Sequence, residues 1–247
     1  MRRQEFAARV WAKLIAHEKA EKLLSPGQRV LAAVSGGPDS VCLAHYLAQR
    51  ARPLTLSVTI LHVHHGLRGR DADLDEALVV ELGRTLGLPV EVARVDVKAA
   101  AKKRGAGLEE AARKLRYEAL EKAARRLRCS VVATGHQLDD QAETVLLNLL
   151  RGTKLSALGG IPPKRALRRG VALVRPLLPL SRADVGDYLA RHGLPSRLDA
   201  TNLSEDFTRN WLRRKVLPLL ASQQPRAREH LAGIAAQVRA ATRPDKR

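Results

Sequence analysis

The 247-residue sequence predicts an α/β fold: a doubly wound, mostly parallel sheet of five strands with a short C-terminal helical appendage. Short runs rich in Val, Ile and Leu alternate with longer segments of helical periodicity, an order typical of a parallel sheet covered by helices. Apolar residues make up 45% of the chain, so a substantial core is available. Because no linker divides residues 1–215, we expect one domain there and a helical tail at 216–247.

The expected strands are short apolar runs, and the expected helices carry apolar residues at intervals of three and four. The strands span residues 30–34, 54–63, 90–97, 130–134 and 171–174. The helices span residues 3–24, 39–50, 71–86, 108–128, 139–150, 181–192, 211–220 and 226–241, with a capping pair at Ser181 and Asp184. Residues 98–107 are basic and contain glycine, so we expect an exposed loop, and residues 151–170 show no clear periodicity.

The composition favours a polyanionic partner. Lys and Arg number 44 against 25 Asp and Glu, a formal net charge of +19, and nucleic acid is the first candidate. Aromatic residues make up only 3% of the chain, so phosphate contacts are favoured over base stacking. The two cysteines, Cys42 and Cys129, form no CxxC pair, which argues against a disulfide framework or a zinc site. No membrane span or signal-peptide core is evident, so we expect no membrane association and a cytoplasmic location.

A glycine-containing loop follows the first expected strand and opens a helix. Its glycines allow a sharp turn with inward-pointing amides, and a helix N-terminus beside glycines binds phosphate. No lysine follows the glycines, so this is not a Walker motif, nor is it a GxGxxG fingerprint. Such a loop suits chemistry in which pyrophosphate leaves while AMP is transferred. The loop consists of Ser35, Gly36, Gly37, Pro38, Asp39 and Ser40.

Three acidic residues open the helix after the fourth expected strand. Asp139, Asp140 and Glu143 are three and four positions apart, so their carboxylates cluster on one side of the helix. His136 comes just before them. The acids are suited to hold Mg²⁺ through oxygen ligands, or equally a cationic substrate such as an amine. Acids in a first turn also commonly cap the helix and compensate its dipole.

Histidines and arginines add to these two motifs. His62, His64 and His65 end the second strand, where alternate side chains point to opposite faces, so a place beside the nucleotide is favoured over a metal site. Ordinary packing at the strand end is the alternative. Arg113 shares a helical turn with other basic residues and could reach a phosphate or carboxylate bidentately, although a solvated basic face has the same pattern. Arg209 belongs to a late polar and basic set without apolar periodicity.

Together these motifs make the chain resemble the tRNA(Ile)-lysidine synthetases of the N-type ATP pyrophosphatase (PP-loop) superfamily, from about residue 25 to 220. The SGGPDS loop alone marks only the superfamily, whereas DDQAET with the late Asn and Arg residues is much more specific. The motifs are SGGPDS at 35–40, HVHHGLR at 62–68, ARKLRY at 112–117, TGHQLDDQAET at 134–144, RPLL at 175–178, DATN at 199–202 and RN at 209–210.

The resemblance implies ATP-dependent ligation of free L-lysine to C2 of the wobble cytidine in tRNA(Ile) with a CAU anticodon. ATP adenylates the C2 carbonyl oxygen, and the lysine amine then displaces AMP. Residues 35–40 and His65 would hold ATP, and Asp39 and Asp140 would bind Mg²⁺. Lysine would bind at Asp139, Asp140 and Glu143. The implied catalytic residues are Asp140 as general base, Arg113, Arg209 and His136.

The sequence also departs from the family pattern. Gln137 stands where the family often has a second histidine, and His64 replaces a common asparagine. Family members usually carry further C-terminal domains that hold the tRNA, so we expect a short form. Two alternatives remain: a tRNA sulfurtransferase of the same superfamily, which would need a reactive cysteine or iron–sulfur ligands, and a non-catalytic, ATP-dependent tRNA-binding module.

Overall fold

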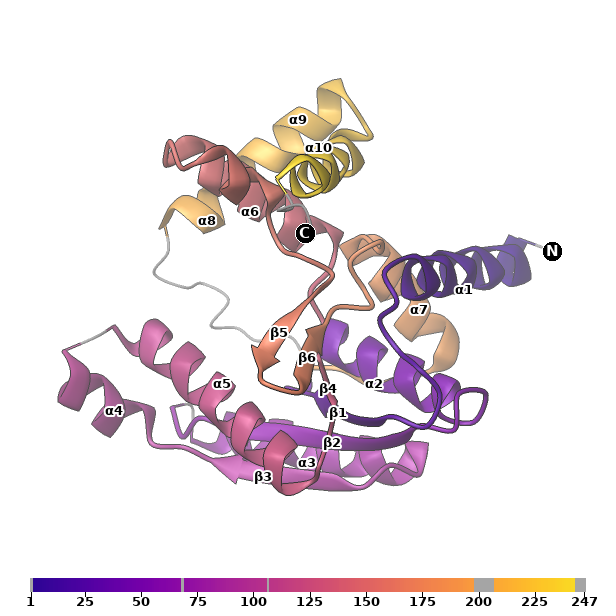
Figure 1. Ribbon diagram of the computed structural model, residues 1–247, viewed down its shortest axis with the longest axis vertical. Coiled ribbons are helices and arrows are strands. Elements are labelled where there is room, and N and C mark those ends of the chain that lie inside the picture. Colours follow the sequence, from indigo (N-terminus) through magenta and orange to yellow (C-terminus); the bar gives the residue numbers. More distant parts are fainter. Residues whose placement is uncertain (1, 68, 106, 198–206, 243–247) are drawn as a thin grey trace.

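A six-stranded sheet forms the centre of the computed structural model, which describes residues 2–67, 69–105, 107–197 and 207–242 (Figure 1). The strand order is β3-β2-β1-β4-β6-β5, and all neighbours are parallel except β5, which is antiparallel to β6. The strands are β1 (Arg29–Ala33), β2 (Ser57–His64), β3 (Val90–Arg94), β4 (Val131–Ala133), β5 (Lys164–Arg168) and β6 (Val171–Val174).

The doubly wound α/β fold is confirmed, but the predicted count of five strands is wrong. The additional strand, β5, lies at the edge of the sheet and has the sequence KRALR, in which four of the five residues are exposed. Charged side chains commonly protect edge strands from pairing with other chains, and they also remove the apolar signal of a buried strand. The pattern of 151–170 therefore gave no indication of it.

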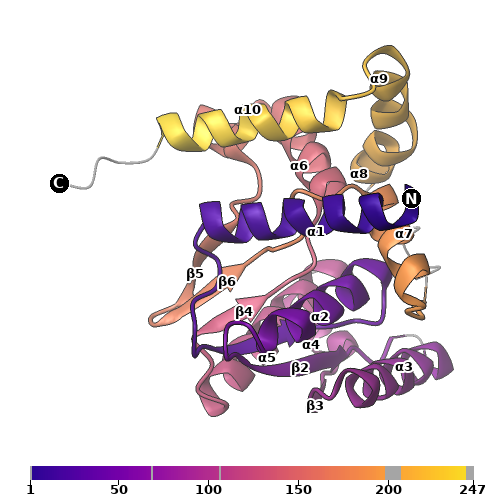
Figure 2. The ribbon, with the colours of Figure 1, turned by 90° about the vertical axis from the view of Figure 1, so that its right-hand side faces the viewer.

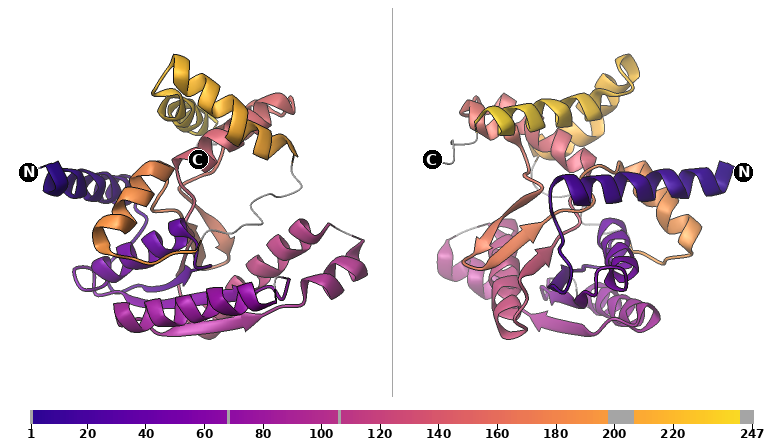
Figure 3. Two further views of the ribbon diagram at one scale, coloured as in Figure 1. Left: turned by 180° about the vertical axis from the view of Figure 1, so that it is seen from behind. Right: turned by 45° about the vertical axis from the view of Figure 1, so that its right-hand side comes forward.

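Helices cover both faces of the sheet because alternate strand residues point in opposite directions. Val30 and Ala32 of β1 pack with α1, α2, α3 and α7, whereas Leu31 packs with α5 on the opposite face. Figures 1 and 3 show α1 and α7 on the α2 side of the sheet. The helices are α1 (Arg2–Ala20), α2 (Pro38–Ala51), α3 (Arg70–Leu86), α4 (Val97–Arg104), α5 (Leu108–Arg126), α6 (Leu138–Leu150), α7 (Arg182–His192), α8 (Phe207–Trp211), α9 (Leu217–Gln223) and α10 (Ala227–Ala241).

The predicted loop at residues 98–107 is wrong over most of its length, because α4 occupies Val97–Arg104. Asp96 caps this helix by accepting a hydrogen bond from the Ala99 amide at 2.9 Å. Val97 and Ala101 are buried against α5, so tertiary packing outweighs the basic, solvent-loving composition. The capping box of Ser181 and Asp184 at the start of α7 is confirmed.

The sheet brings two loops together at its topological switch point. The chain builds outward from β1 to β3 and then returns to place β4 on the other side of β1, so the order reverses between β1 and β4. Ligands bind in such folds at the carboxyl ends of the strands beside that reversal. A Cβ on Gly135, just after β4, would lie 3.0 Å from the carbonyl carbon of Asp39, so only glycine allows this approach to the start of α2.

The C-terminal helices pack on the carboxyl side of the sheet. Figures 1 and 2 show α10 lying across α6. The Arg239 guanidinium donates to the carbonyl of Gly159 in a short 3₁₀ helix, Leu155–Gly159. The proposed domain boundary between residues 215 and 216 stays a prediction. Within the described ranges, no helix is long and apolar enough to cross a membrane.

Candidate active site

The loop after β1 is organised around the hydroxyl of Ser40. This oxygen accepts hydrogen bonds from the amides of Ser35 and Gly36, each at 3.1 Å, and its own proton goes to the Gly37 carbonyl at 2.8 Å. Gly36 has φ of +92°, a backbone conformation that side chains resist. The loop is therefore folded into its turn by the chain itself, without requiring a ligand.

The N-terminus of α2 is open towards the loop. Its N-cap is Gly37, which has no side chain to cap the helix, and Pro38 occupies the first turn. Pro38 has no amide proton and the Ser40 amide donates to the Gly37 carbonyl at 3.0 Å, so within the described chain the amides of Gly37 and Asp39 are the ones left to bind a phosphate. The Arg197 amide donates to the Gly36 carbonyl at 3.0 Å, and its guanidinium contacts Asp75 at 2.7 Å, so this arginine ties the loop to α3.

The charges of Asp39, at the start of α2, and Asp140, at the start of α6, interact across the switch point. Burial, together with the charge of Asp140, raises the pKa of Asp39 to about 7. Burial also raises the pKa of Asp140, although a hydrogen bond from the Gln137 amide acts in the opposite direction. Mutual repulsion of this kind is relieved by a cation. The pair therefore suits a shared divalent metal ion.

The protein side chains fit Mg²⁺ only when substrate phosphates supply part of its ligands. Within residues 2–67, 69–105, 107–197 and 207–242, no three His, Cys, Asp or Glu side chains are arranged as a metal site. Mg²⁺ in ATP-dependent enzymes is commonly held by one or two carboxylates together with substrate phosphates. Asp39 and Asp140 match that arrangement, with the phosphates of ATP supplying the remaining oxygens.

Glu143 is held by two arginines. Its side chain has no exposed surface, and its carboxylate accepts from Arg213 at 2.6 and 3.0 Å and from the Arg209 Nε at 3.0 Å. Arg209 comes from α8, and Arg213 comes from a π-helical turn, Leu212–Val216. Both guanidinium groups also lie 4.0 Å from Asp140. Glu143 therefore fixes two cations beside Asp140.

Asp139 also has partners already. One oxygen accepts from the Arg182 amide of α7 at 2.9 Å, and the other accepts from Arg228 Nε of α10 at 2.8 Å. A lysine ammonium would have to compete with arginines at both Asp139 and Glu143. Their predicted role in lysine binding stays a prediction. The carboxylate of Asp140, 17% exposed, lies 4.0 Å from the guanidinium groups of both Arg209 and Arg213.

His136 lies among arginines and stays neutral near pH 7. Burial lowers its pKa to about 3, and Arg175, Arg116, Arg113 and Arg209 add to the effect, in that order. A hydrogen bond of 3.0 Å joins its Nδ1 to the Thr134 hydroxyl. The predicted catalytic residues His136, Arg113 and Arg209 are thus brought into one charged environment.

The arginines beside His136 surround Tyr117. The guanidinium groups of Arg113, Arg116 and Arg165 lie 5.8, 5.5 and 5.5 Å from the ring centre. Burial alone would raise the pKa of Tyr117, but these arginines and Arg175 outweigh it and lower the pKa. The Nε atoms of Arg116 and Arg175 are buried without a hydrogen-bond partner in the described chain. Such a cluster suits an anion.

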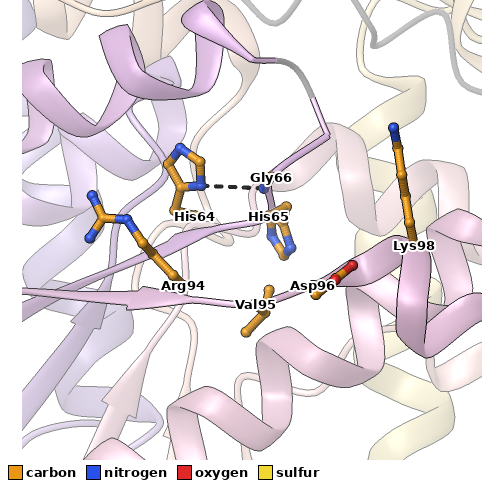
Figure 4. A pocket seen from close by; sticks show the side chains of 7 residues that line it. All are labelled: His64, His65, Gly66, Arg94, Val95, Asp96 and Lys98. Atoms are coloured by element: carbon orange, nitrogen blue, oxygen red, sulfur yellow. Dashed lines mark hydrogen bonds between the residues drawn. The ribbon is translucent and has the colours of Figure 1, made fainter.

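A cavity of about 590 Å³ opens at the carboxyl ends of β2 and β3 (Figure 4). His65 lines it, together with Arg94 and Lys98, and the His64 ring accepts from the Gly66 amide at 3.3 Å. Its size fits a nucleoside. None of residues 35–40 lines it, so the cavity is separate from the phosphate loop, although both follow the carboxyl ends of strands.

Arg213 and Arg228 hold the acids of α6 but were not among the predicted site residues. Arg213 follows Arg209 by four positions, a spacing that places both on one helix face and was the available signal. Nothing local in the sequence connects Arg228 with Asp139. Arg68 and the DATN segment at 199–202 lie outside the described residues.

A family model described as a PP-loop domain matches residues 8–220. The chain is 44% identical over 201 residues to a tRNA(Ile)-lysidine synthase of Symbiobacterium thermophilum, covering 81% of this chain and 41% of that protein. It is 42% identical to a tRNA(Ile)-lysidine synthase of Dehalococcoides mccartyi, covering 84% of this chain and 45% of that protein. The chain thus spans less than half the length of these relatives.

Solved structures share the fold at low sequence identity. The U34-tRNA thiolase NcsA from Methanococcus maripaludis, solved with its [4Fe-4S] cluster, superposes with a TM-score of 0.78 at 18% identity, covering 98% of this chain and 81% of that chain. The NMN synthetase from Francisella tularensis gives a TM-score of 0.57 at 15% identity, covering 98% of each chain. From the matched family model and the loop geometry after β1, the chain belongs to the PP-loop domain family.

Proposed function

We propose that this chain adenylates the wobble cytidine of tRNA(Ile) with a CAU anticodon and then joins L-lysine to C2 of that base. The observation that carries the proposal is the pair Asp39 and Asp140, placed between an open phosphate loop and a set of arginine-clamped acids. The names of the relatives at 42–44% identity support the same reaction.

The adenylation step depends mainly on positioning and charge neutralisation. The amides at the start of α2 would hold the leaving pyrophosphate. Mg²⁺, held by Asp39 and Asp140 with the ATP phosphates, would neutralise charge on the phosphates. Arg113, Arg116 and the neutral His136 would face the adenylated base and its phosphate. The C2 oxygen attacks the α-phosphorus, and the bond from that phosphorus to the bridging oxygen of diphosphate breaks.

In the second step the lysine amine attacks C2 of the adenylated cytidine. The C2–N bond forms, the bond from C2 to the oxygen of AMP breaks, and AMP leaves with that oxygen. The amine must lose a proton, and Asp140 would accept it, since burial raises the pKa of this acid towards the range useful for a base. Arg209 and Arg213, held by Glu143, would stabilise the departing phosphate.

The direct test is transfer of labelled lysine to tRNA(Ile). The chain is incubated with ATP, Mg²⁺, labelled lysine and the tRNA, and both RNA-bound label and release of AMP are measured. Label in the RNA and AMP in equal amounts would support the ligase. Binding of tRNA without any lysine transfer would reject it in favour of the non-catalytic tRNA-binding module.

The sulfurtransferase alternative is disfavoured by the cysteines. The chain has only Cys42 and Cys129, and both are buried. Burial raises the pKa of each thiol, which suppresses the reactive thiolate. Two cysteines also leave too few thiolates for a cluster held by Cys side chains alone. The shared fold with the thiolase, at 18% identity, says nothing of the reaction.

Gly37→Val is expected to prevent ATP binding while the fold persists. Gly37 has φ of −73°, which valine adopts readily, and a Cβ there would meet nothing closer than the Ser35 hydroxyl at 3.7 Å. The larger side chain would instead crowd the amides that face phosphate. ATP affinity by calorimetry and thermal unfolding would be compared with Gly186→Val at an exposed site on α7, where an added Cβ meets nothing within 4 Å. An unchanged ATP affinity would count against the loop assignment.

Asp39 is expected to make stability fall with rising pH. The unfolded group has a pKa near 3.8, whereas the folded group has a pKa of about 7, so the folded state retains the proton longer. This stability is present below about pH 4 and is lost as the pH rises through 7. The Tm of Asp39→Asn, relative to that of the parent chain, should rise progressively from pH 5 to pH 8. Asp187→Asn, at an exposed site on α7, serves as the control. Mg²⁺ with ATP should reduce the difference, and a pH-independent difference would contradict the assignment.

A further inference from the structure

The amino-terminal edge of the sheet, opposite the phosphate loop, carries a hollow of about 270 Å³. It lies where α5 ends, where β4 begins and where the β5–β6 hairpin turns; Figure 2 shows the hairpin at this edge. Four exposed arginines line it, and we call them the arginine rim: Arg125, Arg128, Arg168 and Arg169.

The arginine rim lacks negative charge. No residue lining the hollow is acidic. Glu91 raises the pKa of Cys129, which lines the hollow, but its carboxylate is already paired with Arg126. Among the described residues, the four rim arginines make no ion pair with a carboxylate. Four neighbouring guanidinium groups without a counter-charge repel one another, and a bound anion would remove that repulsion.

The backbone at Arg128 gives a second observation. Arg128 lies two residues after α5, just beyond the C-cap Leu127, with φ of +54°, a left-handed conformation that normally selects glycine. The helices α3, α4 and α7 end in the same way with Gly87, Gly105 and Gly193. A cation near a helix C-terminus interacts favourably with the helix dipole, and Lys22 after α1 has the same geometry. Replacing Arg128 with glycine therefore separates a folding role from a binding role.

We propose that the arginine rim binds the sugar-phosphate backbone of the RNA substrate, at a place separate from the wobble base. The inference rests on the proposed function. The rim offers guanidinium groups and no aromatic surface for base stacking, so it suits phosphates rather than bases. Ser130 and His136 are separated by six residues of largely extended chain, so the rim lies about 20 Å from the reaction centre.

The first test removes two rim charges. Arg168→Ala/Arg169→Ala should weaken binding of full-length tRNA(Ile) on the order of tenfold at low salt. It should also lower the slope of log affinity against log salt by about 2, because two phosphate contacts are lost. ATP binding should not change. The matched control is Lys19→Ala/Arg84→Ala, which removes the same charge from exposed sites on α1 and α3.

The second test is Arg128→Gly. Glycine suits the left-handed conformation, so thermal unfolding should occur at the same or a higher temperature than in the parent chain. Binding of tRNA should nevertheless weaken by at least about threefold. A purely structural role for Arg128 would leave tRNA affinity unchanged, and that result would overturn its assignment to the rim.

The outcomes also separate this inference from the proposed function. If the parent chain transfers lysine and the rim variants bind tRNA with the parent affinity and salt slope, the rim assignment is overturned and the ligase stands. If the parent chain neither binds tRNA(Ile) nor transfers lysine to it, the proposed function fails first. Weaker tRNA binding in both rim variants, with the control pair equal to the parent, would support the rim.

Discussion

Asp140→Asn is expected to reduce lysine transfer on the order of 10²- to 10⁴-fold while ATP still binds. Asparagine keeps an oxygen that can accept the hydrogen bond from the Gln137 amide, so the cap of α6 is retained. It cannot accept the proton of the lysine amine. Because Asp140 is also proposed to hold Mg²⁺, lysine transfer is measured in single turnovers at saturating Mg²⁺, and ATP binding is measured by calorimetry without Mg²⁺.

A matched substitution one position earlier distinguishes the loss of the proton acceptor from the loss of a negative charge. Asp139→Asn removes the same charge from the same helical turn, but Asp139 contacts the Arg182 amide and Arg228. We expect that variant to keep part of its transfer activity and to lose some stability. Full activity in Asp140→Asn would reject its role as general base. Equal losses in both variants would show that charge alone matters.

Glu143→Gln is expected to lower the free energy of unfolding by about 3–5 kcal/mol, because it leaves two guanidinium groups without their buried partner. Glu143 has no exposed surface and holds both Arg209 and Arg213. For a chain of this size that loss corresponds to a drop in Tm of roughly 10 °C. Lysine transfer should fall as well, because both arginines lose their fixed position beside Asp140.

The control for this prediction is Glu81→Gln. Glu81 also pairs with an arginine, Arg84, at 2.8 Å, but both side chains are largely exposed on α3. Exposed ion pairs contribute little to stability, so the Tm should hardly change. If Glu143→Gln unfolds at the parent temperature, the clamp does not support α8 and the π-helical turn as described.

The sequence was informative where a local pattern has one structural solution. Val30 to Val34 with the following glycines predicts a buried strand and a phosphate loop, and β1 with the loop around Ser40 confirms the strand, the turn and the helix that opens after it. The edge strand β5 was missed because KRALR has no buried face, and α4 was missed because two buried positions against α5 outweigh its basic residues.

The candidate site, too, could be predicted only in part from the sequence. The spacing of the acids in α6 predicted a carboxylate cluster, and the structure places Asp39 close enough to Asp140 to raise its pKa. Which acids already have partners could not be predicted. The contacts of Glu143 with Arg213 and of Asp139 with Arg228 join residues 70 and 89 positions apart, and such pairs depend on the fold rather than on any local pattern.

The contact between Arg228 and Asp139 has a consequence for dividing this chain. The interval matched by the family model stops at residue 220, yet Arg228 lies beyond it and neutralises an acid at the start of α6. Arg239 adds a further contact from α10 to the Gly159 carbonyl. A fragment cut at residue 220 would leave Asp139 without this cation and the adjoining face of α6 uncovered. The contacts that set the charge at the start of α6 therefore extend beyond the matched interval, into α10.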